Sequence, residues 1–428
     1  MWFKHFGHGT DGAGEAYHIG IFGITGSGKS TLAKMIMTAY AKHNEMGILV
    51  LDPVGEFAKT LAQENIKDTE SILQNTTSKF NLNMRKICQT LNKKFEVVSV
   101  KNIVLDRWSL FSEILSESRF FQRLTIKNPN KQFAVEAIKS KLREKDKVTL
   151  NKLNERATFD RVIEYLYTDE IQRQIYASEE PRKRIKKILD EIDKDDLFNS
   201  AWKPFCNLFD NKREKSINVD RLLKKLQDEK PILVIDLSMS DESKASNISY
   251  WSEDIQFLVL KRILDGLIDL GEENWHRNSF LNTLVILDEA HRFANREKTE
   301  RQNLEELRMS LLDAVRTTRK YGLGWMFLST SLSSIHREII QQLRIVFYGF
   351  GLSLGSDLIT LKEMVSDPKA IQLYQSFTDP ASSFNTASRK YSFMSRGPVS
   401  PLSFSGSPLF FNVFNSPDEF TQENNLNN

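Results

Sequence analysis

The chain has 428 residues, of which 40% are hydrophobic and 27% are charged, and this length can form two or three domains with large cores. Its formal net charge of +3 is too small to indicate nucleic-acid binding by itself, so any DNA contact must come from local patches or from a ring of subunits. Two cysteines far apart, Cys88 and Cys206, argue against a disulfide or zinc framework and favour a reducing compartment.

The N-terminus has no apolar segment of the kind that forms a signal peptide. Further along the chain, no run approaches the roughly eighteen apolar residues that a membrane span requires. Together with the cysteine count, these features predict a cytoplasmic protein that has no membrane partner.

The first motif is the stretch Gly23-Ile-Thr-Gly-Ser-Gly-Lys-Ser-Thr31, which fits the phosphate-loop pattern G-x-x-x-x-G-K-[ST]. An apolar run over 18–22 precedes it and a helical pattern over 32–40 follows it, as the motif requires. We expect the nucleotide to be bound by Gly26, Ser27, Gly28, Lys29, Ser30 and Thr31.

Each residue type in the loop has a chemical reason. The glycines let the backbone point successive N–H groups at phosphate oxygens, and the following helix adds its positive N-terminus. Lys29 should reach the β- and γ-phosphates, where it also acts in catalysis, and the hydroxyl of Ser30 should be a ligand of Mg²⁺. The stretch therefore predicts an ATP site with Mg²⁺ as cofactor.

A second apolar strand is expected over 47–51, and it ends in Asp52-Pro-Val-Gly-Glu56. The alternation of strand, helix and strand is typical of a parallel α/β sheet, in which ligand-handling groups lie beyond the carboxyl ends of the strands. Asp52 and Glu56 would lie there, either close to the phosphates or as structural acids of the loop.

After a further strand over 95–100, the composition changes to Lys, Glu, Asp, Leu and Ile at helical spacing. We expect a mostly helical insertion domain over 101–229. Its basic run over 182–187 is either a solvated helical face or a surface for nucleic acid or a partner.

The core pattern resumes with a strand over 231–238 and an amphipathic helix over 251–270. The strand over 283–287 follows, and it delivers two acids in succession. Asp288 should hold Mg²⁺ through its hydration shell, and Glu289 should polarise the attacking water. An acidic strand end together with a phosphate loop predicts nucleotide hydrolysis.

Three features follow these acids. His291 is expected to be a structural histidine beside the catalytic acid. A helix over 300–321 carries Arg316 and Arg319 at its C-terminal end, where cations favour the helix dipole. Alternatively, Arg319 is offered to the nucleotide of a neighbouring subunit, where it would stabilise the transferring phosphoryl group.

The remaining strands are expected over 324–331, 345–350, 391–396 and 408–413. The first of them ends in hydroxyls, where motor ATPases place a polar group that senses the γ-phosphate. The polar stretch from residue 416 is expected to be disordered. The predicted organisation is a first part of the ATPase core over 1–100, the insertion over 101–229, a second part of the core over 230–415 and a tail over 416–428.

Taken together, the segments 18–30, 51–56, 234–238, 287–293 and 318–323 resemble the HerA branch of the HerA/FtsK ATPases. The elements Asp-Pro-x-Gly-Glu and Arg-Lys-Tyr-Gly are the most specific part of this likeness. The resemblance implies a RecA-like P-loop NTPase core interrupted by a helical domain. It also implies a homo-hexameric ring that moves double-stranded DNA with ATP, together with a nuclease or other effector, in DNA end processing or antiviral defence.

By the same resemblance, Arg319 corresponds to the arginine that acts in the neighbouring subunit. The sequence departs from the family at two points. The phosphate loop begins at Gly23, which leaves no room for the small β-barrel that precedes it in the family and helps ring assembly and partner docking. Ser331 stands where the family has glutamine, and its shorter side chain predicts altered coupling between nucleotide and ring movement.

Two alternatives to a HerA-type DNA translocase stay open. One is a conjugation or virus-packaging ATPase of the same superfamily, although such proteins commonly carry membrane helices or membrane-docking domains. The other is a ring scaffold in which ATP controls the assembly of an effector enzyme with little translocation. Ser331 and the modest net charge keep this second alternative open.

Overall fold

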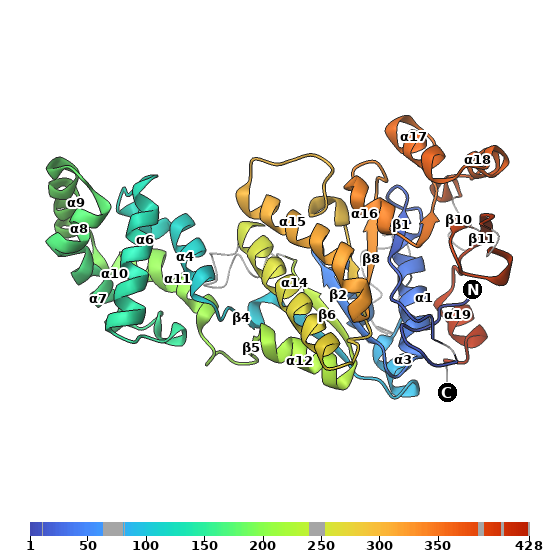
Figure 1. Cartoon of the computed structure of the whole chain (residues 1–428), viewed down its shortest axis with the longest axis horizontal. Helices are drawn as coiled ribbons and strands as arrows, with labels where there is room; N and C mark the ends of the chain where they lie inside the picture. The colour runs from blue at the N-terminus through green and yellow to red at the C-terminus, as the bar shows by residue number, and fades with distance from the viewer. Residues whose placement is uncertain are drawn as a thin grey trace, which may run out of the picture. The chain divides into compact units, whose positions relative to one another are not determined.

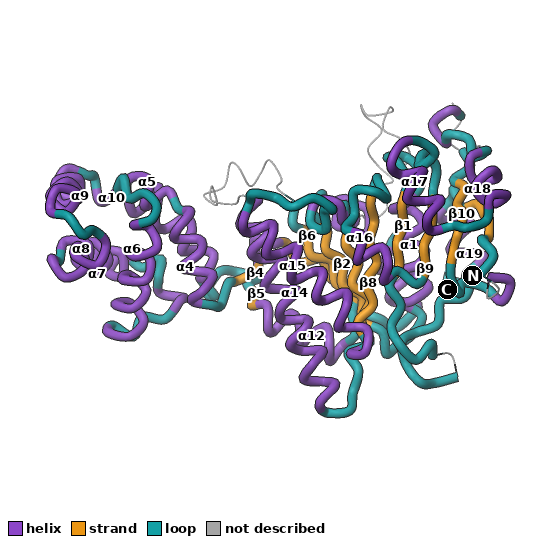
Figure 2. The backbone as a smooth tube through the Cα atoms, turned by 45° about the horizontal axis from the view of Figure 1, so that its top comes forward, coloured by secondary structure: helices purple, strands orange, loops and turns teal. Residues whose placement is uncertain are grey.

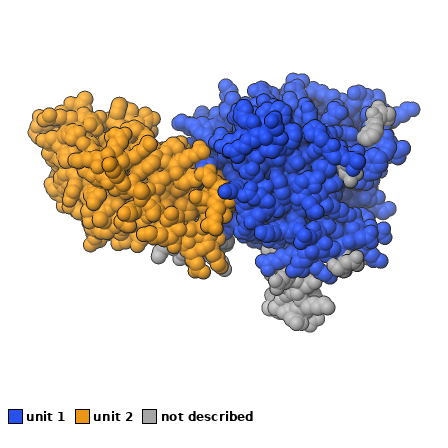
Figure 3. All heavy atoms as spheres, turned by 60° about the horizontal axis from the view of Figure 1, so that its bottom comes forward, with its two compact units in different colours: residues 1–100, 223–238, 260–428 blue, residues 101–222, 239–259 orange. Residues whose placement is uncertain are grey.

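The computed structural model describes residues 1–10, 12–62, 80, 82–238, 253–383, 389–403 and 406–426. The chain forms two compact units, which Figure 3 distinguishes by colour. The first unit contains 1–100, 223–238 and 260–428, and the second contains 101–222 and 239–259. A mostly helical segment thus interrupts the chain of the first unit.

The first unit is built on one nine-stranded sheet with the order β11-β10-β9-β1-β8-β7-β2-β6-β3 (Figure 2). Neighbouring strands from β9 to β3 are parallel, whereas β10 is antiparallel to both β9 and β11. The sheet confirms the predicted α/β fold. Its strands are β1 (Ile19–Phe22), β2 (Gly47–Asp52), β3 (Phe95–Ser99), β6 (Ile232–Asp236), β7 (Thr283–Leu287), β8 (Leu323–Ser329), β9 (Ile345–Tyr348), β10 (Ser392–Arg396) and β11 (Leu409–Asn412).

The central strands β1, β2, β7 and β8 are buried in every position because helices cover both faces of the sheet. Ile48 and Val50 of β2 belong to the same buried cluster as the apolar side chains of α1. Leu49 and Leu51 point to the opposite face and are buried as well. On that face lie α15 and α14 (Figure 1). The helices of this unit are α1 (Lys29–Ala41), α2 (Glu56–Ala62), α3 (Met84–Thr90), α15 (Gln302–Thr317), α16 (Arg337–Gln342), α17 (Gly355–Met364), α18 (Pro368–Gln375) and α19 (Pro417–Glu423).

Two helices belong partly to each unit, α12 (Val219–Glu229) and α14 (Glu253–His276). The second unit is otherwise a bundle of short helices around Trp202, which is fully buried and donates its indole N–H to the carbonyl of Leu153 over 2.8 Å. A small parallel pair, β4 (Ile103–Val104) and β5 (Ile217–Asn218), completes it. Its helices are α4 (Trp108–Glu117), α5 (Arg119–Arg123), α6 (Asn130–Ser140), α7 (Arg156–Tyr167), α8 (Asp169–Ile175), α9 (Glu179–Glu191), α10 (Lys194–Leu197) and α11 (Lys203–Cys206).

The basic run over 182–187 lies on α9, and its lysines are already paired with carboxylates. The pairs are Lys183–Glu179, Lys186–Asp169 and Lys187–Glu191. Because these ion pairs are exposed, they add little stability, but they reduce the positive charge that the run offers to another molecule. The structure therefore favours the interpretation of this run as a solvated helical face.

The C-terminal tail differs from the expectation of disorder from residue 416. Ser416 caps the short helix α19 by accepting a hydrogen bond from the N–H of Glu419. Phe420 on this helix is buried and packs edge-on against Phe80. One aromatic anchor in a polar segment thus holds the tail on the core. In the ranges described above, no helix is both long and apolar enough to cross a membrane.

Candidate ATP-binding and hydrolysis site

The phosphate loop lies between β1 and α1, as its flanking sequence predicts. Gly26 and Gly28 adopt φ angles of +84° and +92°, which residues with a Cβ rarely adopt. Ser30 and Thr31 follow in the first turn of α1, where the backbone N–H groups have no partner within the helix. The loop therefore presents backbone donors and a positive helix end at the same place.

Lys29 is folded back over this loop. Its Nζ donates to the carbonyl oxygens of Gly23 and Ile24 over 2.8 and 3.1 Å. Burial lowers the pKa of Lys29, and the nearby charges of Glu289 and Asp288 oppose that change. The ammonium group is thus close enough to Asp288 and Glu289, the two acids that follow β7, to interact with their charges.

The strand order explains why these distant segments meet. Strand β8 lies between β1 and β7, so the ends of β1 and β7 are roughly 10 Å apart across the sheet. Phe22 pairs with Ser329 and Leu287 with Phe327, so the two acids that follow Leu287 come level with the end of β1. We call the edge where these parallel strands end the carboxyl edge. It carries the phosphate loop and the acid pair together.

Asp288 is nearly completely buried at the carboxyl edge, with an exposed fraction of 4%. Burial, together with the neighbouring charges of Asp52, Glu289 and Glu56, raises the pKa of Asp288 to about 7. Several carboxylates thus converge here, opposed by the nearby charge of Lys29 and, at Glu56, by that of Lys34. A divalent cation would relieve this repulsion.

The sequence left open whether Asp52 lies close to the phosphates or is a structural acid of the loop. In the structure it has a structural role. Its carboxylate accepts hydrogen bonds from the backbone N–H groups of Gly55, Glu56 and Ala58. Burial nevertheless raises the pKa of Asp52 to about 6, with a contribution from the charge of Asp236. Asp52 fixes the turn into α2, and this turn places Glu56 near the acid pair.

Glu289 has an uncommon backbone conformation for a residue with a side chain, with φ +46°. Its Oε2 lies 3.2 Å from Nδ1 of His291. Burial lowers the pKa of His291, so the ring is neutral at physiological pH. This geometry agrees with the expectation of a structural histidine beside the catalytic acid.

The hydroxyls after β8 are arranged differently from what the sequence suggested. Ser331 donates its hydroxyl to Oδ1 of Asp357 over 2.9 Å, so its bond goes to the start of α17. Ser329, the last residue of β8, has its Oγ 3.5 Å from Nδ1 of His291. Ser329 is therefore the hydroxyl of this strand that contacts the acid–histidine pair, and the sequence analysis missed it.

Among the residues that the structure describes, Arg319 is the one predicted site residue that lies away from the phosphate loop and the acid pair of its own subunit. It is in a 3₁₀ turn (Thr318–Tyr321) directly before β8, at the edge of the sheet opposite the carboxyl edge. Its guanidinium pairs with Glu15 over 2.9 Å and is half exposed. The chain thus brings Lys29 and the acid pair together and leaves Arg319 at its surface.

Tyr391, directly before β10, is a second residue that the sequence analysis missed. A Cβ added to Gly28 would lie 2.9 Å from Cδ1 of its ring, so the tyrosine packs directly against the phosphate loop. This contact joins segments more than 350 residues apart, and the sequence around Tyr391 contains no signal for it.

One family model and several solved structures match this chain. The model of the family described as "Helicase HerA, central domain" matches residues 16–251, which is more than half of the chain. Among solved structures, the chain is similar to VirB4 of Thermoanaerobacter pseudethanolicus, with 12% identity, a TM-score of 0.44 and coverage of 94% of this chain and 90% of that one.

Two further solved structures show a likeness at low identity. The genome packaging NTPase B204 from Sulfolobus turreted icosahedral virus 2, in complex with ATP-gammaS, is 8% identical, with a TM-score of 0.37 and coverage of 93% of this chain and 98% of that one. The plasmid coupling protein TrwB, in complex with a GTP analogue, is 13% identical, with a TM-score of 0.36 and coverage of 94% and 79%. The comparison with curated protein sequences found no match. On the family match, the chain belongs to the family of the HerA helicase central domain and is a P-loop ATPase of the HerA type.

Proposed function

We propose that this chain is an ATP-hydrolysing motor that assembles as a homo-hexameric ring and moves double-stranded DNA. It would act with a separately encoded nuclease or other effector, in DNA end processing or antiviral defence. One observation carries the hydrolytic part of the proposal. Lys29 of the phosphate loop and the acids Asp288 and Glu289 lie at the same edge of one sheet, close enough for their charges to influence each other.

In this proposal the residues divide the work of hydrolysis. Backbone N–H groups of the phosphate loop and Lys29 hold the β- and γ-phosphates. Glu289 orients a water molecule and accepts its proton as the water oxygen bonds to the γ-phosphorus. The bond from this phosphorus to the bridging oxygen then breaks, and the products are ADP and inorganic phosphate.

The residues also fit a Mg²⁺ ion. No three His, Cys, Asp or Glu side chains in the described part of the chain are grouped so that they could hold a metal alone. Mg²⁺ typically takes one or two carboxylates together with substrate phosphates and water, so such a group is not required. Ser30 and Asp288 would hold the ion, which would neutralise charge on the β- and γ-phosphates when bound.

The exposed position of Arg319 supports a shared active site. An exposed ion pair such as Arg319–Glu15 is weak, so the guanidinium can exchange this partner for a nucleotide. In a ring, it would reach the γ-phosphate held by the next subunit. Hydrolysis would then require assembly.

We expect Arg319→Ala to lower ATP hydrolysis by about 10³-fold or more, because the transferring phosphoryl group loses a stabilising charge. Arg316→Ala is the matched control, since Arg316 lies one turn earlier and pairs with Glu338 in its own subunit. Its effect should be small.

A mixing experiment tests whether Arg319 acts in the neighbouring subunit. Arg319→Ala and Lys29→Ala subunits, each inactive alone, should recover hydrolysis when they are co-expressed, because some interfaces then combine an intact Lys29 with an intact Arg319. Mixed particles that are confirmed by mass measurement and stay inactive would contradict a shared site.

The DNA part of the proposal is tested by steady-state ATP hydrolysis with and without duplex DNA. A motor that grips backbone phosphates should be stimulated by the duplex, and the stimulation should fall steeply between about 50 and 200 mM salt. A ring scaffold should respond to neither. Mass measurement of the particle with and without nucleotide would count the subunits and reveal a co-purifying effector.

One observation favours the scaffold as a second candidate function. The hydroxyl of Ser331 is bonded to Asp357, at the place where the family has a glutamine that responds to the nucleotide. This bond would weaken the link between nucleotide state and ring movement. ATP hydrolysis that is indifferent to DNA, together with a stable co-purifying effector, would support the scaffold.

A further inference from the structure

A polar cavity lies in the first unit, outside the phosphate loop and the acid pair. Its volume is about 350 Å³, which is within the range of small-ligand pockets. The lining comes from the loop after β7, the loop after β8, α16 and α17. Its residues are Arg296, Ser333, Ile335, Arg337, Ile340, Gln341, Ser356, Ile359, Thr360, Glu363 and Met364.

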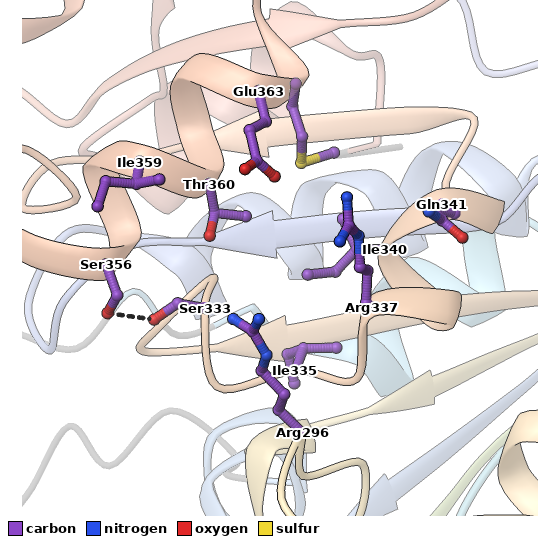
Figure 4. A pocket seen from close by; sticks show the side chains of 11 residues that line it. Arg296, Ser333, Ile335, Arg337, Ile340, Gln341, Ser356, Ile359, Thr360 and Glu363 are labelled. Atoms are coloured by element: carbon purple, nitrogen blue, oxygen red, sulfur yellow. Dashed lines mark hydrogen bonds between the residues drawn. The ribbon is translucent and has the colours of Figure 1, made fainter.

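Two arginines dominate the charge of this cavity. Figure 4 shows Arg296 and Arg337 entering it from different segments, with Thr360 and Glu363 of α17 on the other side. Neither guanidinium makes an ion pair or hydrogen bond with any residue that the structure describes. Two cations against one carboxylate leave a net positive charge, which favours an anionic ligand.

The walls of the cavity are fixed by hydrogen bonds. The N–H of Arg296 donates to the carbonyl of Ser334 over 2.8 Å, which joins the two loops. Asp357 accepts from the N–H of Ser333 over 2.7 Å, and the hydroxyls of Ser333 and Ser356 are 2.9 Å apart. These bonds attach the start of α17 to the loop after β8. The cavity is therefore formed without a ligand, which reduces the entropic cost of binding.

The apolar part of the lining narrows the ligand class. Ile335 and Ile340 are buried in the wall, whereas Ile359 of α17 is 63% exposed. An apolar surface beside two arginines and several hydroxyls suits a ligand that combines a flat base with a phosphate. Glu363 can accept hydrogen bonds from ribose hydroxyls or from a base amino group.

We propose that this cavity binds one nucleoside phosphate, separate from the nucleotide at the phosphate loop. Arg296 and Arg337 would hold the phosphate group, and Ile359 and Met364 would contact the base. The site is also connected to the hydrolytic edge, because Asp357 bonds both Ser333 of the cavity wall and Ser331 after β8. The proposal does not depend on DNA translocation.

The test uses the full chain carrying Lys29→Ala, which removes binding at the phosphate loop. Equilibrium binding is measured with the four common nucleoside monophosphates and with ATP. We expect at least one of these probes to bind saturably. Adding Arg296→Ala and Arg337→Ala should weaken this binding by about tenfold or more, because charged hydrogen bonds to the phosphate are lost.

Two further variants separate the cavity from general effects. Arg344→Ala removes another exposed arginine that directly precedes β9, at the opposite edge of the sheet, and should leave binding unchanged. Thr360→Phe keeps both arginines but fills the cavity from α17, and it should also abolish binding. Unchanged melting temperatures would show that the variants are folded.

Three results would overturn the proposal. The first is that no probe binds to the Lys29→Ala protein. The second is that binding survives the two arginine substitutions or is lost equally with Arg344→Ala. The third is that these arginine substitutions weaken the binding of duplex DNA and leave the nucleoside phosphates unaffected. The arginines would then be DNA backbone contacts. A failure of the hydrolytic proposal alone would be distinguishable, because the Lys29→Ala protein would then still hydrolyse ATP.

Discussion

Replacing Lys29 with alanine should abolish tight ATP binding, whereas replacing Glu289 with alanine should leave binding nearly normal and stop hydrolysis. The ammonium group of Lys29 is placed inside the loop that would hold the phosphates, with bonds to the carbonyls of Gly23 and Ile24 that it can exchange for phosphate oxygens. Glu289 lies after the far strand, beside His291. We expect its loss to lower turnover by about 10²- to 10⁴-fold, the usual contribution of a general base.

The measurement is ATP affinity by equilibrium binding together with steady-state hydrolysis for each variant. Lys42→Ala and Glu297→Ala are matched controls, because both side chains are exposed. Lys42 lies at the C-terminal end of α1, away from the carboxyl edge, and Glu297 follows the acid pair in the chain. Near-normal hydrolysis by Glu289→Ala would show that another group activates the water. Tight binding by Lys29→Ala would show that the loop does not hold the phosphates as proposed.

The local part of the site was predictable from the sequence because its signals are short and continuous. A glycine-rich stretch between a strand and a helix has few structural solutions, so the segment around Lys29 was placed correctly between β1 and α1. Apolar runs that end in acids likewise predicted β2 and β7, with Asp52 and Asp288 at their ends. Parallel strands then bring those ends to one edge.

The contacts that depend on tertiary packing were not predictable. Tyr391 meets Gly28 only because β10 is added to the sheet beside β9, and the sequence does not specify that pairing. The bond from Ser331 to Asp357 similarly depends on where α17 begins. The helix α19 was not predicted for the same reason. The polar composition of this segment indicated disorder, although one of its residues, Phe420, is buried in the structure.

The acidic cluster should lower the stability of the nucleotide-free protein. Asp288→Asn should abolish Mg²⁺-dependent hydrolysis and, at pH 8, stabilise the nucleotide-free protein. Burial and the charges of Asp52, Glu289 and Glu56 raise the pKa of Asp288 from the ordinary 3.8 of an aspartate to about 7. A shift of this size corresponds to up to about 4 kcal/mol of lost unfolding free energy when the carboxylate is ionised.

Proton binding sets the direction in which stability changes with pH. Between the unfolded and folded pKa values of Asp288, the folded protein binds more protons than the unfolded chain, so wild-type stability falls as pH rises toward 7. Above that pH the loss of unfolding free energy is constant. Asparagine carries no charge, so the stabilisation by Asp288→Asn should be large at pH 8 and should shrink steadily toward pH 5.

Melting temperatures of the two proteins across this pH range, without nucleotide, provide the measurement. Asp313→Asn, at an exposed position on α15, is the matched control and should change little. Mg²⁺ with ATP should raise the melting temperature of the wild type more than that of Asp288→Asn, because the variant lacks one of the charges that the cation balances. Equal stabilisation at pH 5 and pH 8 would instead indicate a packing effect of the amide and would exclude charge repulsion as the cause. The same repulsion that lowers the stability of the empty site would then be the source of its affinity for a cation.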